Sequence, residues 1–70
     1  MMNDGFVKFF NRERGFGYIQ MEETASILRV LPSSLKAAGL KKLIEGQKVR
    51  FSTHIDPASG KNVVDTIEIV

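Results

Sequence analysis

The chain has 70 residues, with ten lysines and arginines, eight aspartates and glutamates, and no cysteine. This length predicts one domain over residues 1–70 with a thin core, and the lack of cysteine excludes disulfides and thiolate zinc sites as sources of order. No apolar stretch is long enough to span a membrane and the first residues lack a signal-peptide pattern, so we expect a cytoplasmic protein with no membrane partner.

The first two predicted elements form a hairpin. Residues 5–11 are rich in aromatics and indicate a strand, which the polar residues 12–14 and Gly15 end. Residues 15–21 return as a second strand whose two faces carry different residues: Phe16, Tyr18 and Gln20 on one, and Gly17, Ile19 and Met21 on the other. Periodicity alone does not decide which of these faces points into the core.

The later elements are three short strands and a helical turn. We expect a third strand over residues 27–31, ended by Pro32, and a helical turn capped by Ser33 or Ser34 and stopped by Gly39. Leu35, Ala38 and Leu43 have helical spacing within this region. Strands four and five are predicted over residues 47–53 and 63–70, with a loop over 56–60 between them. The chain is therefore all-β, and the expected core comprises Phe6, Val7, Ile19, Val49, Phe51, Ile67 and Ile69.

Aromatic and basic residues are interleaved in the hairpin. Single-stranded nucleic acids bind to exposed aromatic rings that stack on the bases, with cations nearby for the phosphates. Phe9, Phe16 and Tyr18 supply the rings, and Lys8, Arg12 and Arg14 supply the charges. Because Lys8 and Phe9 are neighbours on one strand, both are exposed only if a bulge or strong coiling of the strand interrupts the alternation.

The hairpin sequence resembles that of bacterial cold-shock proteins. Residues 5–11, GFVKFFN, and residues 14–19, RGFGYI, are similar to that family's G-x-V-K-W-F-N and K-G-F-G-F-I, and residues 39–51 are similar to its stretch leading into the fourth strand. The resemblance implies a small five-stranded antiparallel OB-type barrel, with a short helical turn between strands three and four. It also implies binding of single-stranded RNA or DNA, in an RNA-chaperone or gene-expression role.

The resemblance also implies site residues. Phe9 stands at the family's stacking tryptophan, Phe16 and Tyr18 at its two motif phenylalanines, and Lys8 and Arg14 at its phosphate-contacting lysines, while Phe10 and Asn11 match directly. The family's V-F-V-H motif on strand three aligns with residues 28–31, so that Arg29 replaces a stacking phenylalanine. The predicted nucleic-acid-binding residues are Lys8, Phe9, Phe10, Asn11, Arg12, Arg14, Phe16, Tyr18 and Arg29.

Other functions have less support in the sequence. His54 has no histidine or cysteine partner, the carboxylates are scattered and Ser33 and Ser34 have no paired base, so we expect no metal, no cofactor and no enzymatic activity. The alternative is a cold-shock-like barrel that serves as a protein-interaction or dimerisation module, with Met21, Leu31 and Leu40 as an apolar surface. We expect a monomer or a weak homodimer.

Overall fold

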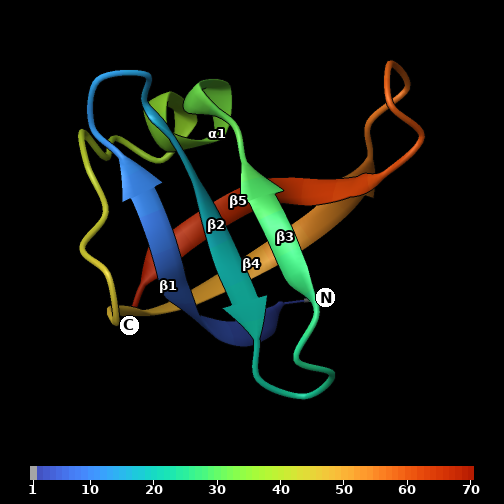
Figure 1. The fold of residues 1–70 in the computed structure, drawn as a ribbon, viewed down its shortest axis with the longest axis horizontal. Coiled ribbons are helices and arrows are strands. Elements are labelled where there is room, and N and C mark those ends of the chain that lie inside the picture. Colours follow the sequence, from blue (N-terminus) through green and yellow to red (C-terminus); the bar gives the residue numbers. More distant parts are fainter. Residues whose placement is uncertain (1) are drawn as a thin grey trace.

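The computed structural model describes residues 2–70, which form a closed barrel of five strands with one short helix (Figure 1). The expected number and order of elements are confirmed, and the predicted bounds differ from those of the structure by one or two residues at most strand ends. The elements are β1 (Asn3–Asn11), β2 (Phe16–Met21), β3 (Ile27–Val30), α1 (Pro32–Ala37), β4 (Lys48–Ile55) and β5 (Asn62–Ile69).

The strands follow the order β1-β2-β3-β5-β4 around the barrel, and β4 pairs back to β1 to close it. All neighbours are antiparallel except β3 and β5, which run parallel through Arg29 opposite Val63 and Val30 opposite Val64. The uniformly antiparallel sheet that we expected is corrected at this one contact. The parallel pair arises because the chain crosses the top of the barrel through α1 before it enters β4 and β5 (Figure 1).

A bulge interrupts β1 between Val7 and Phe9, which is one of the two irregularities that the sequence allowed. Val7 pairs with Ile19 and Phe9 pairs with Tyr18, so the intervening residue has no partner in the ladder. Val7 is 1% exposed, whereas Lys8 and Phe9 both lie on the surface. The extra residue therefore places a charge and an aromatic ring side by side on the outside of the barrel.

The core fills the barrel with side chains from every strand. Val7, Ile19, Val49, Phe51 and Ile67 are buried as predicted. Phe6 is only half-buried, and Ile69 is wrong as a core residue, because it ends β5 at the rim of the barrel and remains 39% exposed. The core also contains residues that we did not predict, which are Phe10, Leu28, Val30, Leu35, Leu43 and Val64.

The helix α1 begins at Pro32, two or three residues earlier than a cap at Ser33 or Ser34 predicts. Pro32 occupies its first turn and Leu31 is its N-cap residue, with no side chain capping the helix. The side chain of Ser34 is buried instead, and its hydroxyl donates a 2.9 Å hydrogen bond to the carbonyl oxygen of Val64 on β5. Gly39 follows the helix with φ +73°, which confirms its predicted role as the stop. The hydrogen bond of Ser34 therefore holds α1 against β5.

Candidate nucleic-acid interface

Three aromatic rings form one cluster on the outer face of β1 and β2. The ring centroids lie 6.4 Å apart for Phe9 and Phe16, 6.3 Å for Phe9 and Tyr18, and 6.0 Å for Phe16 and Tyr18. Phe9 is 42% exposed, and Phe16 and Tyr18 are half-buried. On the opposite face of β2, Gly17 is buried and Ile19 is fully enclosed. The face carrying Phe16 and Tyr18 therefore points outward, which settles the question that periodicity left open.

Gly17 allows β1 and β2 to approach closely beneath the rings. A Cβ atom at this position would lie 2.6 Å from the carbonyl oxygen of Phe9 and 3.0 Å from Cδ1 of Phe10. Real Cβ atoms essentially never come within 3.0 Å of another heavy atom, so a side chain here would push the strands apart. The glycine thus determines the spacing of the aromatic cluster on the other side of the sheet.

The turn between β1 and β2 is held by its own backbone and by Asn11. The side-chain oxygen of Asn11 accepts hydrogen bonds from the backbone N–H of Glu13, at 3.0 Å, and of Arg14, at 3.1 Å. Gly15 has φ +73°, a conformation that residues with a Cβ rarely adopt. These contacts fix where Arg12 and Arg14 leave the barrel.

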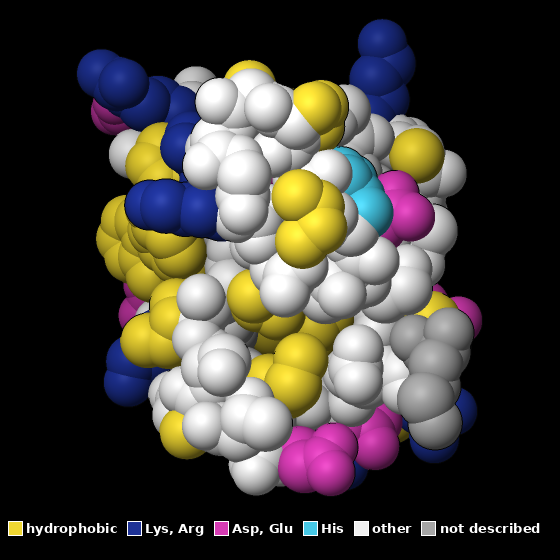
Figure 2. All heavy atoms as spheres, turned by 90° about the vertical axis from the view of Figure 1, so that its right-hand side faces the viewer, with side chains coloured by type: hydrophobic (Ala, Val, Ile, Leu, Met, Phe, Trp, Pro, Cys, Tyr) yellow, Lys and Arg dark blue, Asp and Glu magenta, His cyan; other side chains and the backbone are white. Residues whose placement is uncertain are grey.

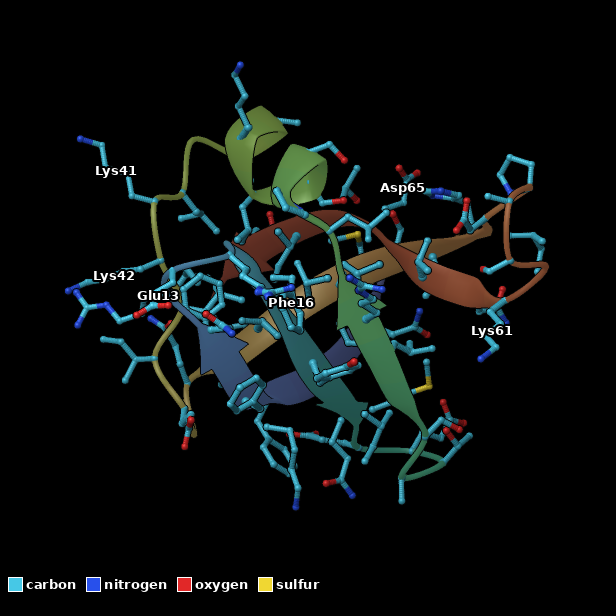
Figure 3. The ribbon with its side chains drawn as sticks, turned by 45° about the horizontal axis from the view of Figure 1, so that its top comes forward. Glu13, Phe16, Lys41, Lys42, Lys61 and Asp65 are labelled. Atoms are coloured by element: carbon cyan, nitrogen blue, oxygen red, sulfur yellow. The ribbon has the colours of Figure 1, made fainter. Side chains whose placement is uncertain are left out.

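Arg29 extends the cluster onto β3. Phe9 pairs with Tyr18, and Tyr18 pairs with Arg29, so the three residues form a row across β1, β2 and β3. The guanidinium carbon of Arg29 lies 5.0 Å from the centroid of the Phe16 ring. This distance is typical of a cation–π contact, which holds the charged group against the aromatic cluster. Figure 3 labels Phe16 close to β3, on the side of the sheet where the aromatic cluster lies.

The basic residues of the chain divide into paired and unpaired groups. Nζ of Lys48 lies 3.9 Å from Oε1 of Glu22, and Nε of Arg50 lies 3.2 Å from Oδ1 of Asp4. Two cations of the basic segment 29–50 are therefore paired with carboxylates. Within residues 2–70, no ion pair or side-chain hydrogen bond involves the exposed cations nearest the aromatic cluster, which are Lys8, Arg12, Arg14 and Arg29. Hydrophobic and basic side chains adjoin one another along the left edge of the face in Figure 2.

The predicted site residues therefore separate into three roles in the structure. Seven of them are on the surface, namely Lys8, Phe9, Arg12, Arg14, Phe16, Tyr18 and Arg29. Phe10 is corrected: its side chain is 8% exposed and belongs to the core, because the bulge restores the alternation after Phe9 and turns Phe10 inward. Asn11 uses its side-chain oxygen to build the turn.

The apolar docking surface of the alternative hypothesis does not form as one patch. Met21 lies at the end of β2 and Leu40 follows α1, at opposite ends of the barrel (Figure 1). Both side chains are partly buried and pack against the core. Their apolar area is therefore largely used within the barrel.

The described residues were also compared with the requirements of a metal site and of a membrane span, and they meet neither. Within the described residues, 2–70, no group of three or more histidine, cysteine, aspartate or glutamate side chains could hold a metal ion. Nδ1 of His54 lies 3.3 Å from a carboxylate oxygen of Asp65. No helix in this part of the chain is long and apolar enough to cross a membrane.

Comparison with known proteins agrees with this geometry. Residues 3–66 match the family described as the 'Cold-shock' DNA-binding domain. The cold shock protein CspA of Rhizobium meliloti is 42% identical over 66 residues, covering 94% of this chain and 96% of the relative. A probable cold shock protein of Sinorhizobium fredii is 38% identical over 97% of this chain and 99% of its own length. CspC of Bacillus subtilis is 46% identical over 71% of this chain and 74% of its own. The chain belongs to the cold-shock domain family.

Proposed function

We propose that this chain binds single-stranded RNA or DNA on the outer face of β1, β2 and β3. The observation that carries the proposal is the cluster of Phe9, Phe16 and Tyr18, whose centroids lie 6.0–6.4 Å apart on an open surface. Large aromatic side chains are normally buried, so a surface cluster of rings indicates a binding site. Every base has a flat π-face that can stack on such a ring.

The arrangement supports binding that depends on charge as well as on stacking. Each stacked base contributes about 1–3 kcal/mol. On β3, Arg29 stands where the V-F-V-H motif that the sequence resembles has a stacking phenylalanine. Phe9, Tyr18 and Arg29 form one row, in which Phe9 is the most exposed ring and Arg29 adds a cation. The unpaired cations Lys8, Arg12 and Arg14 lie at the β1 end of this row and are suited to phosphate contacts.

Fluorescence titration with labelled nine-residue oligothymidine and oligouridine tests the proposal. Phe9→Ala and Tyr18→Ala should each weaken binding by about 1–3 kcal/mol, or roughly 5- to 150-fold. Val70→Ala is the matched control, because this side chain is 64% exposed and follows β5, which is not part of the proposed face. Affinity that is unchanged in both aromatic variants would contradict the proposal.

The salt dependence of binding measures the part played by charge. Four phosphate contacts, from Lys8, Arg12, Arg14 and Arg29, predict a slope of log K against log salt near −3, since each contact to a single strand contributes about −0.7. Arg14→Ala should reduce the slope by about 0.7. Lys48→Ala removes a cation that is paired with Glu22 and should leave the slope unchanged.

The proposed cellular role follows from binding of single strands by stacking and charge. A protein that holds single strands by stacking and charge disfavours base pairing, which suits an RNA chaperone or a regulator of gene expression in the cytoplasm. All residues of the proposed interface belong to β1, β2, β3 and the β1–β2 turn of one chain, which supports binding by a single copy. The proposed binding unit is therefore a monomer, with at most a weak homodimer.

A further inference from the structure

A hollow of about 320 Å³ lies beside the aromatic cluster, over β3. Tyr18 lines one side of it, and the loop between β4 and β5 lines the other. Its apolar lining includes Leu31 and Val63, and Val63 is 4% exposed although it is separate from the main core cluster. Figure 3 shows Lys61 of that loop on the far side of β3 from Phe16. An aromatic wall with apolar neighbours and polar groups at the edges suits a flat heterocyclic base.

Two unpaired cations line this hollow. Arg29 and Lys61 both contribute to its wall, and no ion pair or side-chain hydrogen bond within residues 2–70 involves either charged group. Arg29 has five N–H donors in a planar fork, and its contact with Phe16 restricts where that fork lies. The hollow therefore offers hydrogen-bond donors to a ligand with adjacent acceptors.

Asp56, on the loop between β4 and β5, also lines this hollow. One oxygen of Asp56 accepts a 3.3 Å hydrogen bond from the backbone N–H of Ala58, and the other accepts a 3.1 Å bond from the hydroxyl of Ser59. The backbone carbonyl of Asp56 accepts a 2.7 Å hydrogen bond from the N–H of Gly60, and its backbone N–H donates a 2.8 Å hydrogen bond to the carbonyl of Lys61. These bonds fix the loop. A carboxylate has about four acceptor positions, so Asp56 retains capacity for a ligand's donors.

From these groups we infer that the hollow is a guanine-selective base site within the proposed single-strand interface, an inference that rests on the proposed function. Guanine presents two adjacent acceptors, O6 and N7, which an arginine fork matches. Guanine also has two adjacent donors, N1–H and the exocyclic N2 amino group, and a carboxylate can accept a hydrogen bond from each. On the corresponding edge, adenine has an amino donor beside N7, cytosine has an amino donor, and thymine has a single acceptor. None of these three bases therefore matches both Arg29 and Asp56.

Titration of nine-residue oligothymidines carrying one central substitution tests this inference with the unaltered protein. A central guanine should bind at least about fivefold more tightly than a central adenine or cytosine. Central 7-deazaguanine, which lacks the N7 acceptor, and central inosine, which lacks the N2 amino group, should each lose part of that advantage. Equal affinity for all central bases would overturn the inference and leave the proposed function standing. No binding to any oligonucleotide would overturn both.

Variants then assign the two edges of the base. Arg29→Ala should remove the discrimination between guanine and 7-deazaguanine, and Asp56→Asn the discrimination between guanine and inosine. Lys36→Ala is the control for the loss of one charge, because Lys36 lies on α1 and does not line the hollow. If Arg29→Ala weakens every oligonucleotide by the same factor, whichever base is central, Arg29 does not read the base and the inference is wrong.

Discussion

Replacing Gly17 with alanine perturbs the contact on which both the barrel and the aromatic cluster depend. The new methyl group would lie 2.6 Å from the carbonyl oxygen of Phe9, which is part of the backbone, and 3.0 Å from the ring of Phe10, which is part of the core. Neither group can move without shifting β1. Overpacking of this kind costs about 1–3 kcal/mol, and the backbone contact favours a value near 2 kcal/mol.

Thermal and urea denaturation followed by circular dichroism measure this cost. For a domain of this size, a loss of about 2 kcal/mol lowers Tm by roughly 8–16 °C. The urea midpoint should fall with little change in the m-value, because the surface exposed on unfolding is nearly the same. At a temperature where the variant remains folded, its affinity for oligothymidine should also fall, since shifting β1 displaces Phe9 relative to Tyr18.

Gly39→Ala provides the matched control. Gly39 has φ +73° and no atom within 4 Å of its would-be Cβ, so alanine there introduces backbone strain without a clash. We expect a loss of stability of about 1–2 kcal/mol with no loss of affinity. A Gly17→Ala protein that melts at the wild-type temperature and binds normally would refute the argument that this glycine sets the strand spacing.

Three further predictions concern single contacts. Ser34→Ala removes the hydrogen bond to the buried carbonyl of Val64 and should cost about 1–3 kcal/mol in urea denaturation, with no effect on binding. Asn11→Ala removes the acceptor for two backbone amides of the β1–β2 turn; those amides should exchange hydrogen faster, and affinity should fall although Asn11 stacks on no base. A double-mutant cycle of Phe16→Leu and Arg29→Ala on stability should give a coupling energy of about 0.5–1 kcal/mol, because the cation–π pair is at the surface; additive effects would mean that the pair does not hold the guanidinium in place.

The strands and the aromatic hairpin could be predicted from the sequence because both depend on local pattern. Alternating residues and turn chemistry located the five strands. The conflict between Lys8 and Phe9 predicted a bulge or strong coiling in the first strand, and the structure has the bulge. The burial of Phe10 could not be predicted, because it depends on where the bulge lies. The exposure of Ile69 likewise depends on where the barrel ends.

The hollow over β3 had no local signal. Asp56 and Lys61 belong to a loop that the sequence marked only as a turn, and they meet Tyr18 and Arg29 because β5 pairs in parallel with β3. That pairing joins segments more than thirty residues apart along the chain. Composition and periodicity describe neighbours in sequence, so they contain no information on such a contact.

The sequence by itself therefore determined that this protein is a small all-β barrel with an aromatic and basic hairpin, because strand periodicity, turn residues and charge are local properties. Only the tertiary structure decided which face of β2 points outward and that the Arg29 guanidinium lies over Phe16. It also decided that Asp56 and Lys61 share a hollow with Tyr18 and Arg29. Those features arise from closure of the barrel, which brings distant strands together and leaves a single side of each for the solvent.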